Sequence, residues 1–388
     1  MAVWSTDVNT IQPMLPAGPL SWAPLRARPR RWWLWAVIPI GLLVLAAALS
    51  PLITLPYYAI APGSARMVDD LIVTPPDHHY PPKGEILLTT VTLRQVNPLG
   101  ALEGWLDPDT DVVPSKEILG PKTPPSKLRQ QNLQMMDDSK QVAEVVAMRR
   151  VGLTVPETGA GAIVADVLPG SPATGHLAPG EVIVGVDGKP VHLSSEAVDL
   201  VRKKKVGDSV RLTVDKGDGT PARTEVVALG ARSLDGTSCT PTDPGTHQPC
   251  MGVTLGTKDH RFQMPINVSI DSLGIGGPSA GLAFTLGLID ELTPGELTGG
   301  RKIAVTGTIE IDGTVGPVGG VAQKTAAVLA EHADAFLVPA EEYAQASARA
   351  GKHLKVIKVT TLDEALRALG TLGGDVSALG VSGTNAPG

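Results

Sequence analysis

The sequence of 388 residues holds few aromatic residues, few cysteines and no excess of positive charge. Aromatic residues make up 3% of it, so its cores must be built mainly from Val, Leu, Ile and Ala. The formal net charge of −6 argues against nucleic acid as a partner, because nucleic-acid-binding proteins carry concentrated basic faces. Neither GxxxxGKS nor GxxxxGKT occurs, so the sequence shows no phosphate-binding loop of an ATP-driven motor.

Charge is absent altogether from the 24 residues between Trp32 and Leu55. A helix of that length, at about 1.5 Å per residue, can cross a hydrocarbon core of about 30 Å. Four arginines lie from Arg26 to Arg31, and the positive-inside rule then places the N-terminus in the cytoplasm. We expect a flexible cytoplasmic tail over 1–31, a single transmembrane helix over 32–55 and an extracytoplasmic remainder held at the cell membrane. The alternative is a signal peptide cleaved near Ala46–Ala48, although the apolar stretch continues past that site.

The only two cysteines, Cys239 and Cys250, flank a loop rich in Pro, Thr and Gly. In an oxidising compartment they could close a small disulfide loop, which agrees with export. Two unpaired thiols remain the alternative. A zinc site is disfavoured because only His247 lies between the cysteines as a further ligand, and no metal is predicted.

Residues 56–150 mix a strand, a loop and a helix, and could be part of a domain formed further along the chain. Gly84–Arg94 is rich in Ile, Leu, Val and Thr, which is typical of a strand. Residues 97–130 carry many Pro, Asp and Lys without a clear period, so a loop is expected. Asn132–Arg150 has apolar residues at near-helical spacing, which predicts an amphipathic helix.

Short strands between glycine turns characterise residues 151–230. This stretch resembles a PDZ domain of the bacterial type. The resemblance rests on Pro169-Gly170-Ser171-Pro172-Ala173, Leu177-Ala178-Pro179-Gly180-Glu181-Val182-Ile183 and Val186-Asp187-Gly188-Lys189-Pro190-Val191. PDZ domains bind extended peptides by strand addition, so a peptide-binding site is implied, with Gly152, Leu153, Thr154 and Val155 as its candidate residues. The alternative is a module that only spaces or orients its neighbour.

Strands and helices alternate over residues 231–370, which we assign to one domain. We expect helices at Pro278–Leu292 and Val321–His332, and strands at Ile303–Thr306, Thr308–Ile311, Ala335–Val338 and Val356–Val359. A capping box of Thr361 and Glu364 begins a last helix. The glycine-rich residues 371–388 are expected to be disordered.

Ser279 lies among glycines at the predicted start of a helix. A serine that attacks a peptide carbonyl must pass its proton to a base and must hold the resulting oxyanion against preorganised donors. Backbone N–H groups at a helix N-terminus are suitable donors, and glycine permits the close approach of a substrate strand. Ser279 is therefore a candidate nucleophile, with Gly277, Pro278 and Ala280 as supporting residues.

Lys324, which follows the serine by 45 positions, is the candidate base. Lysine can act as a base near neutral pH only when burial lowers its pKa by penalising the charged form. The surrounding segment Val321–Val328 contains no acid that would hold the charge. Thr306 or Thr308 could hydrogen-bond the neutral amine and orient it.

Residues 251–370 resemble the proteolytic domain of Lon-type proteases, which use a Ser–Lys dyad. The resemblance rests on Gly277-Pro278-Ser279-Ala280-Gly281, Thr306-Gly307, Gly316-Pro317-Val318-Gly319-Gly320 and Lys324, in the order of the family. It implies Ser279 as nucleophile, Lys324 as base and Thr306 as the partner of the lysine. One departure is Gly276, near which the family pattern carries an acidic residue.

The implied fold class is α+β, with a single N-terminal transmembrane helix, a β-rich PDZ-like domain and a Lon-type α/β domain of the ribosomal S5 domain 2-like kind. This combination resembles the ATP-independent membrane proteases of bacteria. In that group the PDZ-like module is an insertion, so Gly84–Arg94 would pair with the Lon-type sheet. The resemblance implies a serine endopeptidase that acts on peptides or unfolded proteins, uses no cofactor and can form a homo-oligomer.

Three other functions remain open. The G-x-S-x-G pattern at Ser279 also fits the nucleophile elbow of α/β-hydrolases, with His332 or His353 as the base. The glycine run could instead form the phosphate cradle of a small-molecule kinase. The third is a membrane-bound PDZ scaffold that binds peptides and carries an inactive protease-like domain.

Overall fold

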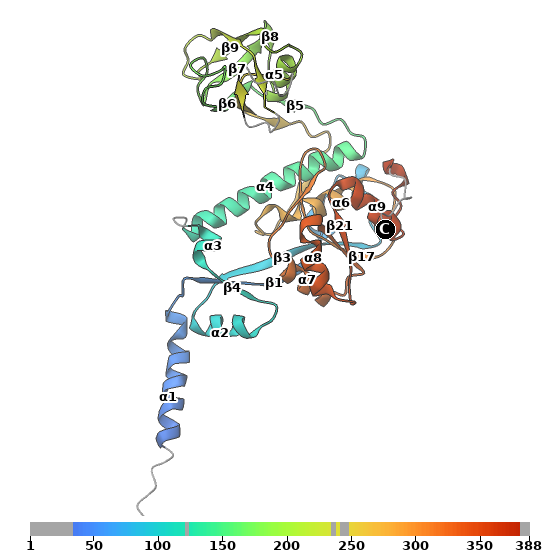
Figure 1. Ribbon diagram of the computed structural model, residues 1–388. Helices are drawn as coiled ribbons and strands as arrows, with labels where there is room; N and C mark the ends of the chain where they lie inside the picture. Colours follow the sequence, from blue (N-terminus) through green and yellow to red (C-terminus); the bar gives the residue numbers. More distant parts are fainter. Residues whose placement is uncertain (1–33, 121–123, 234–237, 241–247, 381–388) are drawn as a thin grey trace, which may run out of the picture.

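The computed structural model describes residues 34–120, 124–233, 238–240 and 248–380, and the predicted tail at 1–31 lies outside them. Figure 1 shows a helix that projects from the N-terminal end, a larger domain in the middle and a smaller β-rich domain above it. The larger domain is built from chain segments that precede and follow the smaller one. Helix α4 (Pro125–Arg150) runs along the larger domain and leads into the smaller domain.

A six-stranded sheet forms the centre of the larger domain. Its order is β21 (Lys355–Val359), β20 (Ala335–Pro339), β17 (Lys302–Val305), β3 (Glu85–Gln95), β1 (Tyr57–Met67) and β4 (Asp111–Pro114). β3 pairs in parallel with β17, where Ile86 faces Ile303, and antiparallel with β1. A strand that precedes the smaller domain therefore lies within this sheet, and the smaller domain is an insertion into the larger one.

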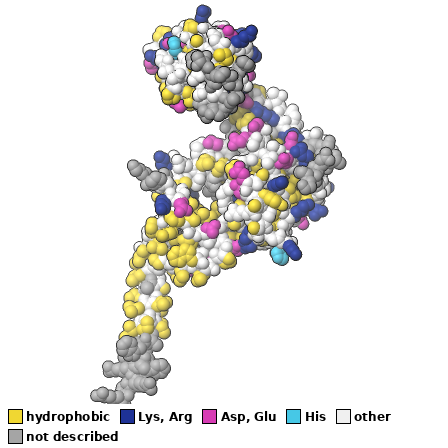
Figure 2. Space-filling model, in the orientation of Figure 1, with side chains coloured by type: hydrophobic (Ala, Val, Ile, Leu, Met, Phe, Trp, Pro, Cys, Tyr) yellow, Lys and Arg dark blue, Asp and Glu magenta, His cyan; other side chains and the backbone are white. Residues whose placement is uncertain are grey.

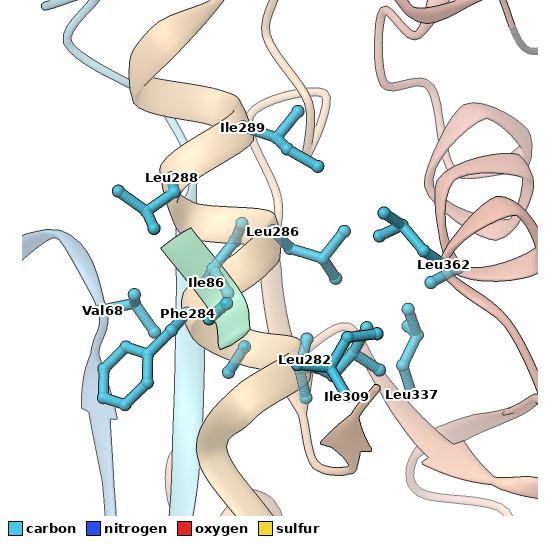
Figure 3. Close-up of a cluster of buried hydrophobic side chains, with 14 of the residues drawn as sticks. Val68, Ile86, Leu282, Phe284, Leu286, Leu288, Ile289, Ile309, Leu337 and Leu362 are labelled. Atoms are coloured by element: carbon cyan, nitrogen blue, oxygen red, sulfur yellow. The ribbon is translucent and has the colours of Figure 1, made fainter. Parts of the chain in front are cut away.

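The central strands carry apolar side chains on both faces, which buries them between two layers of helices. On one face Ile86, Leu88 and Val305 pack with α4, α6 (Gly281–Leu292) and α9 (Leu362–Thr371). On the other face Leu87 and Ala304 pack with α7 (Val321–Ala330) and α8 (Tyr343–Ala350). Figure 3 shows the first of these clusters around α6.

The smaller domain contains a second sheet. Its order is β10 (Arg223–Ala228), β9 (Ser209–Asp215), β7 (Val182–Val186), β6 (Ala162–Val167) and β14 (Val253–Thr257), and helix α5 (Ser194–Arg202) lies against it. The predicted domain boundary is wrong at β14. Residues 231–370 were assigned to the C-terminal domain, but β14 belongs to the smaller domain. The strand pairs antiparallel with β6, with Leu255 facing Val164, and packs on the core of the smaller domain.

A three-stranded sheet precedes β14 and carries the two cysteines. β11 (Gly230–Arg232) lies between β12 (Cys239–Thr240) and β13 (Pro249–Cys250), and a disulfide joins Cys239 to Cys250. Short strand pairs complete the fold: β8 (Lys189–Pro190) with β7, β5 (Glu157–Thr158) with β15 (Arg261–Phe262), β2 (Ile72–Val73) with β16 (Ser269–Ile270), and β18 (Thr308–Ile309) with β19 (Val315–Gly316). The β5–β15 pair lies where the chain enters and leaves the smaller domain.

The loop predicted over 97–130 is wrong. The described residues in this range form α2 (Pro98–Leu106), β4, α3 (Ser115–Leu119) and the start of α4. α2 begins where Oδ1 of Asn97 accepts a hydrogen bond from the Gly100 N–H at 2.7 Å. Leu99, Leu102 and Leu106 recur there at helical spacing, which the prediction missed, although the buried residues of the helix, Ala101 and Gly104, are small.

The disorder predicted over 371–388 is wrong as far as residue 380. Leu372, Val376 and Leu379 are buried in the core cluster that surrounds α6, and Leu379 lies in a 3-10 turn at Ser377–Leu379. These apolar side chains fix the segment although glycines separate them. Residues 381–388 lie outside the described part of the chain.

The helix predicted over 32–55 ends early, because α1 (Leu34–Leu49) stops at Leu49; residues 32 and 33 lie outside the described part of the chain. Helix α1 ends in a 3-10 turn, η2 (Ser50–Leu52), and Ile53 is extended with φ −111° and ψ 113°. Pro56 also disfavours the helical conformation at the residue before it. Among the described residues, no helix combines the length and the apolar character needed to cross a membrane.

Candidate active site

Ser279 lies in a short 3-10 turn, η5 (Pro278–Ala280), that leads directly into α6. Gly277 has a φ of +94°, which side-chain-bearing residues rarely adopt, and its N–H donates to the Asn132 carbonyl at 2.8 Å. Ser279 is half-buried and Ala280 is buried. The turn is therefore held firmly while the serine keeps an accessible surface.

Helix α4 holds this turn from a distant part of the sequence. Oγ of Ser139 donates a hydrogen bond to the Pro278 carbonyl at 3.0 Å. Gly281 permits the close packing, because a Cβ at this position would lie 2.7 Å from Oγ of Ser139 and 3.0 Å from Cγ2 of Ile309. Ser139 could not be found from the sequence, because it lies 139 positions from its partner and belongs to no motif.

The side chain of Lys324, on α7, is buried, with 2% of its surface exposed. Burial lowers its pKa to about 8, because desolvation penalises the ammonium form, while the negative charge of Glu342 acts in the opposite direction. A pKa near 8 leaves part of the amine neutral at physiological pH, which is what a general base requires.

Thr306 connects the lysine to the serine turn. Nζ of Lys324 donates a hydrogen bond to Oγ1 of Thr306 at 3.1 Å. The same Oγ1 donates to the backbone carbonyl of Ser279 at 3.3 Å, and the N–H of Gly307 donates to that carbonyl at 3.0 Å. One buried hydroxyl thus contacts both the amine and the residue that carries the candidate nucleophile.

The helix that carries Lys324 is positioned by strands that precede the inserted domain. Its N-cap, Gly320, has a φ of +67°, and a Cβ there would lie 2.7 Å from Cγ1 of Val91 on β3. Nε2 of Gln323 donates to Oδ2 of Asp111 on β4 at 2.8 Å. Strands β3 and β4 therefore help to position the helix that carries the lysine.

Glu342 is a second charged group near the lysine, and no motif in the sequence singles it out. Its Oε1 accepts a hydrogen bond from the N–H of Val318 at 3.3 Å, in the glycine-rich loop that leads to Lys324. Its Oε2 is buried without a hydrogen-bond partner among the described residues. The carboxylate both orders this loop and favours the charged form of the amine.

The geometry also bears on the predicted alternatives. Thr308, the other candidate partner of the lysine, faces Gly316 in the β18–β19 pair. His332 and His353 are both exposed. An α/β-hydrolase elbow needs a strand that runs into the serine, whereas a loop separates Ser279 from β16. The hydrolase interpretation therefore gains no support.

The four residues predicted to bind peptide lie at the junction of the two domains. Leu153 packs on a cluster formed by Val145 and Met148 of α4 together with Val155, and Val155 is buried. Gly152 closes the end of α4 by donating to the Arg149 carbonyl at 3.1 Å. Gly152–Val155 contribute no strand to the sheet of the smaller domain; Leu153 and Val155 pack on this cluster, whereas Gly152 and Thr154 are exposed.

A different element has the geometry of a strand-addition site. β14 is an edge strand of the smaller domain's sheet in the described part of the chain, and α5 lies beside it. The N–H of Ser194, at the start of α5, donates to Oγ1 of Thr257 at the end of β14 at 3.0 Å. The sequence indicated this strand only weakly, because a segment closed by the Cys239–Cys250 disulfide separates β14 from the rest of its domain.

Within the described ranges, no group of three or more His, Cys, Asp and Glu side chains is placed to hold a metal ion.

Two family models match separate parts of the chain. Residues 146–226 match the PDZ domain, and residues 255–371 match the Lon protease (S16) C-terminal proteolytic domain. The second match contains the Ser279 turn, Thr306 and Lys324. The chain therefore contains the proteolytic domain of a Lon-type serine peptidase. Its PDZ domain lies in the sequence between β3 and β17, two strands that pair in the sheet of the proteolytic domain.

Curated relatives point to the same class. The chain is 33% identical over 93 residues to a Lon protease of Chloroflexus aggregans, which covers 23% of this chain and 11% of the relative. It is 31% identical over 113 residues to Lon protease 2 of Bacillus subtilis, which covers 29% of this chain and 20% of the relative. The chain thus spans a fifth or less of the length of these relatives.

Two solved structures of PDZ domains are similar to a part of this chain. The PDZ domain of an SdrC-like protein from Listeria monocytogenes is 28% identical, with a TM-score of 0.21, and the match covers 25% of this chain and 90% of that one. The corresponding domain from Listeria innocua is 27% identical, with the same TM-score, and covers 26% and 99%.

Proposed function

We propose that the chain is a membrane-anchored serine endopeptidase that cuts extended peptide segments without ATP, with Ser279 as nucleophile and Lys324 as general base. The observation that carries this proposal is the hydroxyl of Thr306, which contacts both the Lys324 amine and the Ser279 backbone. The Lon-type match over residues 255–371 supports the same reaction class.

In the proposed reaction, neutral Lys324 takes the proton of the Ser279 hydroxyl as Oγ attacks the carbonyl carbon of the scissile peptide bond. The carbonyl oxygen becomes an oxyanion that the N–H groups at the η5 turn, including that of Ala280, stabilise, because the first N–H groups of a helix lack intrahelical partners. The lysine ammonium then protonates the leaving amine. Water, activated by the same amine, hydrolyses the acyl-enzyme and restores the serine.

The proposed substrates are extended segments of peptides or unfolded proteins. The sequence shows no nucleotide-binding loop that would drive unfolding, and we propose that such a segment is already extended when it binds. The edge of β14 beside α5 suits an added peptide strand, which would supply main-chain hydrogen bonds to the PDZ domain. Self-association into a homo-oligomer remains a prediction from the Lon resemblance.

The proposed anchor is the uncharged stretch from Trp32 to Leu55, which includes α1. Apolar side chains on α1 are exposed, among them Ile40 at 62% and Leu43 at 71%, so the described part of the chain leaves them uncovered. Arginines precede the stretch, which supports a cytoplasmic N-terminus and an extracytoplasmic peptidase. The Cys239–Cys250 disulfide fits an oxidising compartment.

Casein digestion by the detergent-solubilised full chain, in a buffer without ATP, tests the peptidase. Wild type is compared with Ser279→Ala and with Ser209→Ala, which alters an exposed serine of the inserted domain. We expect wild type and Ser209→Ala to cut casein equally and Ser279→Ala to be inactive. Peptide binding to β14 without any cleavage by wild type would favour the scaffold instead.

A further inference from the structure

The outer face of α2 is apolar and lies beside the base of α1. The residues on this face are exposed to an unusual degree: Leu99 43%, Leu102 50%, Trp105 67% and Leu106 77%. They recur at spacings of three and four and so form one stripe along the helix. Exposed apolar side chains are common singly, but a contiguous stripe on a formed helix indicates a surface that something covers.

The orientation of this stripe is fixed by the opposite face of the helix. Ala101 is 1% exposed and packs in a small core with Ala59 and Val96. Gly104 is buried so closely that a Cβ would lie 2.6 Å from Cγ2 of Val112 on β4. The helix therefore cannot roll its apolar stripe inward without breaking this packing.

Direct bonds attach α2 to the segment that continues α1. The N–H of Leu99 donates to Oγ of Ser50 in η2 at 3.0 Å, and Ser50 is buried. The N–H of Leu55 donates to the Val96 carbonyl at 2.8 Å, just before α2 begins. Figure 2 shows the consequence: the hydrophobic side chains of α1 continue onto the adjoining surface of the larger domain, where α2 lies.

We propose that the Leu99–Leu102–Trp105–Leu106 stripe of α2 is a second membrane contact that lies in the interface of the lipid bilayer anchored by α1. This rests on the proposed anchor, because the argument for lipid as the occupant is the continuity of the stripe with α1. Trp105 suits the position, since tryptophan is enriched where hydrocarbon meets headgroups. Two attachment points would hold the β1–β3–β4 side of the catalytic domain against the membrane and direct the site toward membrane-proximal segments.

Acidic groups border the stripe and limit the class of lipid headgroup that it can bind. Glu103 is exposed on the adjacent face, opposite Arg94 at 4.0 Å, and Asp107 follows the end of the helix. Anionic headgroups would gain nothing from these carboxylates. The stripe should therefore bind through apolar burial, as amphipathic interfacial helices do, and bind zwitterionic lipid at least as well as anionic lipid.

Site-directed spin labelling of the full chain in phosphatidylcholine vesicles tests the proposal. The native cysteines are paired in a disulfide, so a nitroxide can be directed to an added cysteine. Labels are placed by Leu102→Cys on the stripe, Glu103→Cys on the adjacent face of the same helix, and Leu43→Cys on α1. Collision with oxygen, which concentrates in lipid, is compared with collision with a water-soluble nickel chelate.

We expect the oxygen-to-nickel ratio at position 102 to be several-fold higher than at position 103. A high ratio at 43 with a water-like ratio at 102 would leave the anchor standing and overturn the α2 contact. Water-like ratios at both 43 and 102 would overturn both. Low collision with both reagents at 102 would mean that protein, such as a second copy of the chain, covers the stripe, and this too would overturn a lipid contact.

Discussion

The amine of Lys324 donates a hydrogen bond to the hydroxyl of Thr306 at 3.1 Å, deep in the catalytic domain. Because that hydroxyl also donates to the Ser279 backbone, movement of the serine turn and the orientation of the amine are linked through one side chain. A mobile, solvated lysine would be a poor base, since it would be charged at neutral pH. Burial lowers the pKa of the amine, and the hydrogen bond to Thr306 fixes its orientation.

The rate of cleavage should rise with pH. Lys324 has a pKa of about 8, and its neutral form is the base, so activity is low below that pH and reaches a plateau above it. At pH 7 we expect roughly a tenth of the plateau rate, since about that fraction of the amine is neutral. Initial rates on a fluorogenic peptide from pH 5 to 10 measure this, and a flat profile would rule out a lysine base.

Glu342→Gln should move this pH profile to lower pH. The carboxylate raises the pKa of Lys324, so a neutral amide that keeps the hydrogen bond from Val318 should lower it further. The matched control is Glu341→Gln, an exposed neighbour that leaves the profile in place. A pH profile for Glu342→Gln that coincides with that of wild type would show that the Glu342 charge does not affect the pKa of Lys324.

Thr306→Val should reduce kcat by about 10- to 100-fold while the protein remains folded, because the change keeps the shape but removes the hydroxyl that orients the lysine. Thr306→Ser, which restores the hydroxyl, should recover most of the activity. Steady-state kinetics on both variants make the comparison. Equal losses in Val and Ser would point to packing of the methyl group instead of the hydrogen bonds.

Asp290 should make the protein less stable as pH rises. Burial, reinforced by Glu296, Asp69 and Glu291, raises its pKa from an ordinary value of 3.8 to about 7. The folded state therefore holds this proton more tightly than the unfolded state, so the stability that Asp290 contributes is fully present below about pH 4 and is lost as pH rises toward about 7. Asp290→Asn should remove on the order of 1–3 kcal/mol of this decrease.

The measurement is the free energy of unfolding in urea, with wild type and Asp290→Asn compared at pH 5 and pH 8. The variant should lose less stability than wild type between these two values. Parallel losses would show that Asp290 does not titrate in this range, and the decrease would then have to come from other groups such as Asp69, whose pKa is raised to about 6.

The sequence predicted those parts of the site that lie in short local motifs. The serine turn and the uncharged helix around Lys324 are such motifs, and the burial of the lysine is confirmed. Ser139, Asn132 and Glu342 were missed, because their contacts depend on how distant segments fold together. No periodicity within α4 reveals that its Ser139 contacts a turn beyond the inserted domain.

The fold was predictable to a similar extent. Strand β3 was found from its composition, the family resemblance placed it in the Lon-type sheet, and the structure confirms this by pairing it in parallel with β17. The boundary after the PDZ domain was misplaced, since β14 returns to its sheet after a disulfide-closed excursion that resembles a linker. Helix α2 was missed, although Leu99, Leu102 and Leu106 have helical spacing, because the loop prediction rested on the many Pro, Asp and Lys residues of the range 97–130.

The most direct test of the dyad is the cleavage of casein by Lys324→Met at pH 9. Methionine fills the buried site with a side chain of similar length and removes only the amine, so the variant should fold at least as stably as wild type. We predict that it cuts casein no faster than Ser279→Ala. Cleavage by a folded Lys324→Met at a rate near that of wild type would contradict the assignment of Lys324 as the base.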